Sequence, residues 1–194
     1  MKNYEMIREI FNECSGNQMR DVFFSEVAVE NIDEYVKTIT KNEDVHIPAL
    51  ITADGVHDVA YNDFHIGEGA EIKIIAGCGI HNCGDEESRH DGIHTFFVGK
   101  NAKVKYVEKH YGQGDGNGKN IMNPETYVEL AENSYMEMET AQIKGVDSTN
   151  RKTTAKVLKN ATLIVQEKIM THGSQYARTE FDVELNGEGA GTHV

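Results

Sequence analysis

A short pattern that recurs about every 30 residues constrains the fold of this chain more than any other feature. Each of five copies has an apolar residue, a polar turn with Gly or Asn, a small residue and then an alternating apolar and polar segment. The small residues, spaced 32, 32, 27 and 29 positions apart, are Ala70, Ala102, Ser134, Ala161 and Ala190. Alternation with a period of two is typical of strands that bury one face. The repeat predicts a mainly β chain, a stacked β-solenoid, with a β-sandwich as the alternative.

The repeat divides the chain into two parts. It begins near residue 60 and continues to residue 194, and no linker-like segment interrupts it. We therefore predict a helical or mixed segment over residues 1–59 and a β-solenoid core over residues 60–194. The last copy, at residues 184–194, opens another coil without supplying a cap for the strand edges. We expect the solenoid to be truncated at that end.

The segment ahead of the repeat contains a helical pattern. Apolar residues recur at i, i+3, i+4 and i+7, which is one face of a helix. These residues are Ile7, Ile10, Phe11 and Cys14. Cys14 is expected to lie in a core, because a buried free cysteine behaves as a small hydrophobic side chain. A second short helix is expected over residues 31–41.

The charge balance excludes several classes of partner. The chain has 19 Lys and Arg residues against 32 Asp and Glu residues, a net charge of −13. Nucleic acid and anionic membranes both require a basic face, so neither is an expected partner. No apolar run is long enough for a transmembrane helix, and residues 1–11 lack the apolar core of a secretory signal. We expect a cytoplasmic protein whose three cysteines form no disulfide framework.

The stretch GCGIHNCGDEESRHDGIH, residues 77–94, is the strongest candidate site. Its thiols and imidazoles are Cys78, His81, Cys83, His90 and His94. Thiolate and imidazole ligands at such short separations suit zinc or ferrous iron. A thiolate flanked by cationic histidines would also have a lowered pKa and could accept sulfur. The residues alone leave three interpretations open: a metal site, a site of sulfur chemistry and a polar loop.

Two further polar stretches receive structural interpretations. The glycine-rich residues 112–119 lack the spacing of a phosphate-binding loop and the acidic ligands of a calcium loop, so we expect a long flexible connection between coils. Tyr106, Glu108 and His110 point to one face of a strand by their period of two. A carboxylate beside a histidine can act as an acid and a base, but we favour the interpretation that Glu108 and His110 are a hydrogen-bonded pair on a solvated sheet face. Arg151 belongs to no pattern.

Three runs of sequence resemble the SufB/SufD family of iron–sulfur cluster assembly proteins. They are AGCGIHNCGDEESRHDGIHTFFVGKNAKVKYVEKHYG (76–112), NPETYVELAENSYMEMETAQIKGVDSTNRKTTAKVL (123–158) and VELNGEGA (183–190). The resemblance covers about residues 60–194 and is strongest with the shorter members of the family. It implies a right-handed parallel β-helix that acts as a scaffold without turnover of its own. Iron and sulfide would be assembled on the scaffold and passed to other proteins.

The resemblance also implies roles for residues and partners. Cys78 corresponds to a β-helix cysteine that accepts and relays sulfur, and Cys83 and His90 would join it in holding a transient iron–sulfur cluster. His81 and His94 complete the predicted metal-ligand set. The implied partners are a sulfur donor protein, a second SufB/SufD-type chain in a homo- or heterodimer, and a SufC-like ABC ATPase. Any ATPase activity would belong to that partner, whose docking region is expected in a part of the family that this chain lacks.

Two other functions remain open at this point. In the first, Cys78, His81, Cys83 and either His90 or His94 close a tetrahedral zinc site that stabilises the loop. In the second, the chain is a structural β-solenoid with a solvated loop and only an interaction role.

Overall fold

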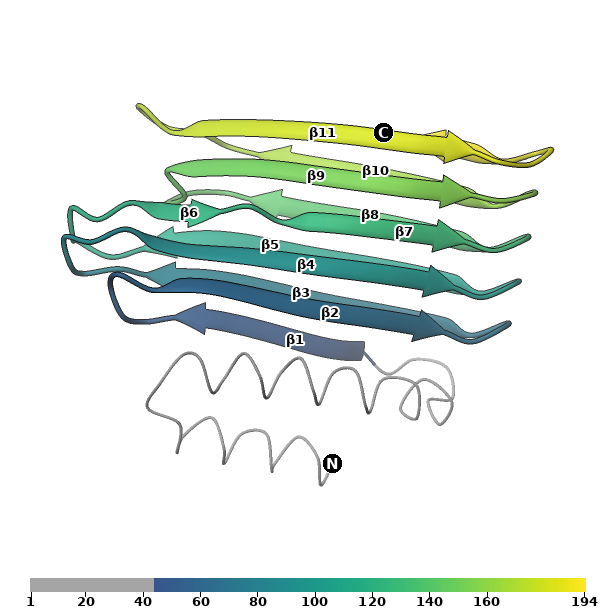
Figure 1. The fold of residues 1–194 in the computed structure, drawn as a ribbon, viewed down its shortest axis with the longest axis horizontal. Coiled ribbons are helices and arrows are strands. Elements are labelled where there is room, and N and C mark those ends of the chain that lie inside the picture. Colours follow the sequence, from purple (N-terminus) through teal and green to yellow (C-terminus); the bar gives the residue numbers. More distant parts are fainter. Residues whose placement is uncertain (1–43) are drawn as a thin grey trace, which may run out of the picture.

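The computed structural model describes residues 44–194, which form a parallel β-helix of about five turns (Figure 1). No helix occurs within these residues. The fold predicted from the repeat is therefore confirmed, and the β-sandwich alternative is wrong because every strand pairs with a parallel neighbour one coil away. The two predicted helices, over residues 7–14 and 31–41, lie outside the described residues.

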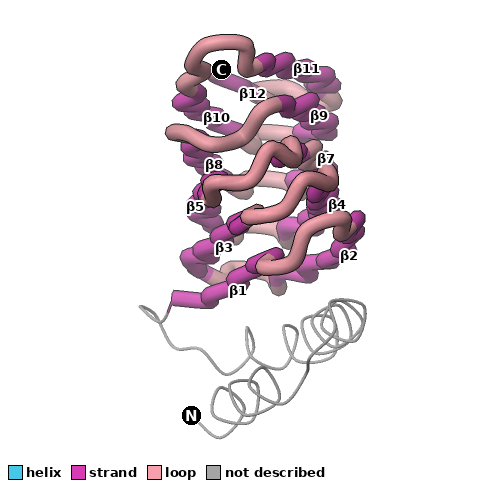
Figure 2. The backbone as a smooth tube through the Cα atoms, turned by 90° about the vertical axis from the view of Figure 1, so that its left-hand side faces the viewer, coloured by secondary structure: helices cyan, strands magenta, loops and turns pink. Residues whose placement is uncertain are grey.

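The strands form two sheets that face each other across the interior of the β-helix (Figure 2). The first sheet contains, in spatial order, β1 (Asp44–Ile51), β3 (Glu71–His81), β5 (Lys103–Gln113), β8 (Tyr135–Gln142), β10 (Thr162–Ile169) and β12 (Gly191–His193). The second contains β2 (His57–Ile66), β4 (Ser88–Val98), the consecutive strands β6 (Asn120–Met122) and β7 (Glu125–Leu130), then β9 (Ser148–Val157) and β11 (Tyr176–Leu185). Each coil therefore contributes one rung to each sheet.

The sequence repeat reflects the way in which successive strands of the first sheet pair with one another. Glu71 pairs with Lys103, Lys103 with Tyr135, Tyr135 with Thr162 and Thr162 with Gly191. Each of these residues directly follows one of the five small residues, so the spacings of 32, 32, 27 and 29 are the lengths of successive coils. Register fixes which side chains share a face, because a slip of one residue would turn every side chain to the other side.

The turn ahead of each small residue requires a left-handed backbone. Asn101, Asn133 and Asn160 have φ values of 59°, 60° and 55°, and Gly69 and Gly189 occupy the equivalent positions with φ values of 68° and 71°. Glycine and asparagine are the residues that adopt this conformation at least cost. The three asparagines also form a ladder, since Asn133 donates to the side chain of Asn101 and Asn160 donates to that of Asn133.

The β-helix begins earlier in the chain than the sequence analysis expected. β1 pairs with β3 from Asp44 to Ile51, so a regular coil precedes the predicted boundary at residue 60, which falls inside β2. The segment 44–56 lacks the repeat's turn signature, which explains why its strand was not recognised. At the other end, β11 lies on β9 and β12 lies on β10 (Figure 1).

The glycine-rich stretch 112–119 connects β5 to β6, as predicted, and it stacks closely on the loop of the preceding coil. The Gly116 N–H donates to the Asn82 carbonyl, and the Gly118 N–H donates to the Gly84 carbonyl at 3.0 Å. A Cβ atom on Gly118 would lie 2.0 Å from the Glu86 carbonyl oxygen. Glycine is therefore required there because the two loop backbones approach too closely for a side chain.

The interior of the β-helix has an apolar part and a polar part. The apolar part is a large cluster built around Phe64, Phe96 and Tyr106, and a second, smaller cluster surrounds Ile80 and Met122. Between them lie buried polar side chains that alternate with the outward residues of the same strands. The candidate site belongs to this polar part of the interior.

Candidate functional site

The site is a group of buried polar side chains that five strands direct inward. β3 supplies Cys78, β4 supplies His90 and His94, β5 supplies Glu108 and His110, β2 supplies Asp58, and β9 supplies Arg151. All seven are buried. Two of the contacts are between neighbours in register, Asp58 with His90 and Cys78 with His110, each separated by 32 residues. The length of one coil therefore brings them together.

Cys78 is a buried thiol between two histidines. Its side chain is 4% exposed, His110 is its register partner on β5, and His90 and His110 both act on its thiol electrostatically. Burial raises the pKa of Cys78, but the charge of His90 and the hydrogen bonds from both histidines outweigh burial and lower the pKa to about 6. Cys78 is therefore a thiolate at neutral pH, which is the nucleophilic and metal-binding form of cysteine.

Asp58 holds His90 in place. The Asp58 Oδ2 atom lies 2.6 Å from His90 Nδ1, and both side chains are buried. Burial lowers the pKa of His90, whereas the Cys78 thiolate and the hydrogen bond with Asp58 raise it, with a net value of about 10. Asp58, His90 and Cys78 thus form a carboxylate–imidazolium–thiolate series. In this series the Asp58 carboxylate orients the His90 ring toward the Cys78 sulfur.

Glu108 accepts hydrogen bonds from several directions. Tyr106 Oη donates to its Oε1 atom at 2.9 Å, His110 Nε2 lies 3.2 Å from the same oxygen, and Arg151 Nη2 donates to Oε2 at 3.0 Å. Burial raises the pKa of Glu108, but the positive charge and hydrogen bonds around it lower the pKa well below its usual range. Glu108 is therefore a carboxylate, and it raises the pKa of Tyr106, whose burial acts in the same direction.

Arg151 fixes the proton on His110. Arg151 Nη1 lies 3.0 Å from His110 Nδ1, and arginine can only donate, so Nδ1 accepts and the ring proton sits on Nε2. That proton faces Glu108 and Cys78. Burial lowers the pKa of His110, but Glu108 and Cys78 raise it to about 9. Because a second proton on Nδ1 would oppose Arg151, full protonation of His110 requires this contact to open. The geometry therefore holds the Nε2–H form.

The arginine also ties the site to the next coils. Its Nε atom donates to Glu167 Oε1 at 3.0 Å, and Thr179 Oγ1 donates to the other Glu167 oxygen at 2.9 Å. Beyond His110, the side chains of Thr140, Gln142 and Thr149 are buried and have polar atoms without a protein partner among the described residues. Such groups normally bind internal water or a small polar ligand.

The buried group could bind a metal ion. One ligand atom each from Cys78, Glu108 and His110 lie within 4.8 Å of one another, and sulfur, oxygen and nitrogen together suit zinc or ferrous iron. A metal on His110 Nε2 would displace the ring proton to Nδ1, where it would oppose Arg151 Nη1. Metal binding and the observed Arg151–His110 hydrogen bond therefore exclude each other.

The structure divides the five predicted ligands into two groups. Cys78, His90 and His94 lie in the interior, although the His94 Nε2 atom is 3.6 Å from Glu108 Oε1, beyond hydrogen-bond distance. His81 and Cys83 lie elsewhere: Cys83 is exposed, and its Sγ atom is 3.2 Å from His81 Nε2. The structure therefore does not bring the five predicted ligands together in one centre, and it places His81 and Cys83 of the zinc alternative apart from Cys78. His81 is three residues from Cys78 on a strand, so it points to the opposite face.

Four of the seven site residues, Asp58, Glu108, His110 and Arg151, are not among the ligands predicted from the sequence. Tyr106, Glu108 and His110 do share one face, as predicted, but this face is the buried interior and not a solvated sheet surface. Asp58 was missed, although it precedes His90 by one coil of 32 residues and is its register partner. Nothing in the sequence around Arg151 identifies its partners, because two intervening coils separate it from Cys78.

Comparison with known protein families, with curated proteins and with solved structures finds no match to this chain. Among the described residues, no helix is long and apolar enough to cross a membrane. The function therefore has to be inferred from the geometry of the buried site and from the sequence pattern.

Proposed function

We propose that the protein is a scaffold or partner subunit in SUF-type iron–sulfur cluster assembly, with Cys78 as the group that accepts and relays sulfur. The observation that carries this proposal is the Cys78 thiolate held between His90 and His110 inside a β-helix. Two independent arguments support it. The SufB/SufD resemblance implies this fold, and it singles out the same cysteine that the buried network activates.

The proposed reaction is a transfer of one sulfur atom. The Cys78 thiolate attacks the outer sulfur of a persulfide on the donor protein, a new S–S bond forms at Cys78, and the S–S bond of the donor breaks. The donor leaves as a thiolate, so no external oxidant or reductant is consumed. The positive charge of His90, together with His110, stabilises the negative charge on the sulfur.

Burial gives the site a second property that suits a sulfur carrier. A persulfide is lost when a free thiol attacks it, and a group that is 4% exposed is poorly accessible to thiols in solution. Delivery by a donor protein therefore requires a local opening of the β-helix next to Cys78. We include the sulfur donor, a second SufB/SufD-type chain and a SufC-like ATPase among the proposed partners.

In this function the protein would bind iron transiently and pass it on. Cys78, Glu108 and His110 provide three donors of different types, and a mixed, incomplete ligand set binds weakly enough to release its metal. His94 is near Glu108 and could join them. Cys83 and His81 are separate from this group, so they are not included among the proposed cluster ligands.

The test is to load the anaerobic protein with sulfur from a persulfide donor and then to attempt cluster reconstitution. We expect Cys78→Ser to lose both the mass gain of one sulfur atom and the cluster, whereas Cys83→Ser retains both. The two variants make the same chemical change, one in the interior and one on the surface. Equal sulfur loading and equal cluster content in the two variants would reject the proposal.

A resident metal site is the second candidate function, favoured by the 4.8 Å grouping of Cys78, Glu108 and His110. A structural metal contributes to folding free energy, so chelation should then lower the melting temperature. In this case, the purified protein would contain zinc without acid-labile sulfide, and Arg151→Met should raise the zinc affinity by removing the competing hydrogen bond. An unchanged melting temperature after chelation would reject this candidate.

A further inference from the structure

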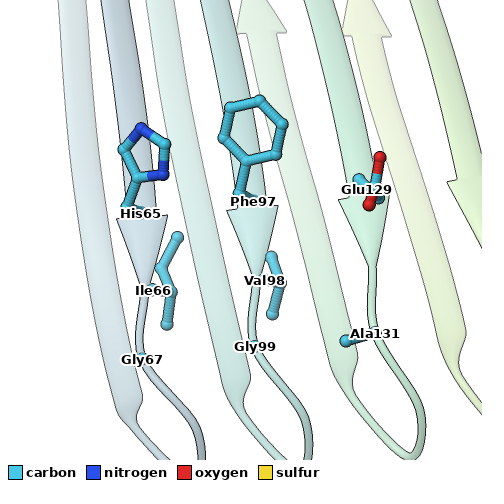
Figure 3. Close-up of a pocket in the computed structure, with 8 residues that line it drawn as sticks. All are labelled: His65, Ile66, Gly67, Phe97, Val98, Gly99, Glu129 and Ala131. Carbon is cyan, nitrogen blue, oxygen red and sulfur yellow. The ribbon is translucent and has the colours of Figure 1, made fainter.

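A pocket on the outer surface lies at the corner where strands of the second sheet end (Figure 3). It has a volume of about 270 Å³ and is lined by His65, Ile66, Gly67, Phe97, Val98, Gly99, Glu129 and Ala131. His65, Phe97 and Glu129 occupy one outward-facing column on β2, β4 and β7, one coil apart. The pocket is therefore separate from the Cys78 site, whose side chains face inward.

The column begins as a stack of aromatic rings. The rings of His65 and Phe97 are stacked, with centroids 4.8 Å apart and planes at 15° (Figure 3). This separation equals the usual distance between neighbouring strands. Tyr127 contacts Phe97 edge-on at 6.3 Å, so it adds to the aromatic wall without covering the column. Phe97 is 37% exposed, although the large aromatic side chains of the interior are fully buried.

The third rung of the column carries a carboxylate in place of a ring. Glu129 follows Phe97 in register, and Tyr127 Oη donates to its Oε2 atom at 3.3 Å. The next rung is Lys156, but these two described side chains form no ion pair within 4.0 Å. The pocket therefore offers an open aromatic face beside a carboxylate that accepts a hydrogen bond from Tyr127 and has no cationic partner within residues 44–194.

We propose that this pocket binds the guanidinium group of an arginine side chain from a partner protein. A guanidinium is planar, so it can continue the His65–Phe97 stack as the next layer and pair with Glu129 in the same plane. Lysine fits less well because its ammonium is a compact, strongly hydrated charge without a flat face. The net charge of −13 favours a basic partner segment in general, and the pocket selects one residue type within it.

The test uses NMR signals of the His65 and Phe97 rings while the full chain is titrated with three peptides, Ac-Gly-Arg-Gly-NH₂ and its lysine and citrulline analogues. Citrulline keeps the planar shape of arginine and removes its charge. We expect saturable shifts with the arginine peptide, weaker shifts with lysine and the weakest with citrulline. Affinity should be low, on the order of millimolar, because a single exposed side-chain site is involved.

Two variants with the same charge change serve as probe and control. Glu129→Gln removes the carboxylate of the pocket and should weaken binding of the arginine peptide about fivefold, the upper range for an exposed ion pair. Glu125→Gln changes a residue on the same strand, outside the pocket, and should leave binding unchanged. Equal shifts with citrulline and arginine, equal effects of the two variants, or no shift with the arginine peptide would each overturn the proposal.

Discussion

The apolar and polar parts of the interior are built from the same strands but have opposite consequences. β4 and β5 contribute Phe96 and Tyr106 to one part and His90 and His110 to the other, so a few residues along each strand separate them. In the apolar part, burial itself stabilises the fold. In the polar part, burial is unfavourable for each charge, and only the partners offset it. The comparison suggests that the first part holds the coils together and the second serves a function.

The largest expected effect is on the apolar part. Phe96 is fully buried, and its ring stacks on Phe64 with centroids 4.6 Å apart. Phe96→Ala should lower the free energy of unfolding by about 3–5 kcal/mol through lost burial and the cavity left behind. Denaturant unfolding measures this. Phe97→Ala, at the neighbouring outward position, is the control and should cost much less; similar losses would contradict the assigned strand register.

The second prediction concerns the loss of stability when the buried Glu108 carboxylate loses its partner Arg151. Arg151→Met leaves Glu108 buried without its main cation and should cost about 3–5 kcal/mol. Glu108→Gln with Arg151→Met removes both charges and should cost less than the sum of the two single changes. A double-mutant cycle on unfolding free energies measures this coupling. Additive losses would mean that Glu108 and Arg151 do not depend on each other.

The structure explains which parts of this architecture the sequence could predict. Turn chemistry is local: Asn101 and Asn133 mark coil corners by their left-handed backbone, so the repeat and the fold follow from short patterns. Which residues of a strand share a face is also a local property, because side chains alternate between the two faces. Tyr106, Glu108 and His110 were therefore placed on one face correctly. Whether that face is buried depends on the opposite sheet, and a single strand contains no information about it.

The composition of the site depends on relations over a longer range. Five thiol and imidazole residues close together in sequence suggested one centre. His81 and Cys78 are, however, three residues apart on β3, so their side chains point to opposite faces of the strand. The actual partners of Cys78 lie one coil away or across the interior. Knowing the 32-residue register would have predicted the pairs Asp58–His90 and Cys78–His110. Arg151 comes from a later coil of different length, so its contact required the structure.

The ionisation of Cys78 provides a pH-dependent test of the polar part of the interior. The folded state lowers the pKa of Cys78 from 9.0 to about 6, so the thiolate absorbance of Cys78 should have a midpoint near pH 6 in the folded protein and near pH 9 in denaturant. Ultraviolet difference spectra of the protein against its Cys78→Ser variant measure both midpoints, and they need no reagent to reach the buried thiol. Since the folded pKa is the lower one, ionisation of Cys78 stabilises the fold fully above about pH 9, and this contribution is lost as the pH falls toward 6.

The smallest expected effect tests Asp58 as a positioning residue. Asp58→Asn removes the negative charge that orients His90 and raises its pKa, while the amide keeps the shape of the side chain. The titration midpoint of Cys78, measured by the same thiolate absorbance, should rise by about one pH unit, which corresponds to about 1.4 kcal/mol of lost stabilisation of the thiolate. Asn62→Ala, four residues away on the same inward face, should leave the midpoint unchanged. An unchanged midpoint in Asp58→Asn would show that His90 acts without Asp58.

The arrangement of the site along the chain has a consequence for the newly synthesised protein. Cys78 leaves the ribosome before His90, His110 and Arg151, and its partners assemble only as successive coils are wound. Until then the thiol is an ordinary cysteine with low reactivity at neutral pH. The pKa of Cys78 therefore reaches its lowered value only after the later coils have formed, and by then the thiol is already buried.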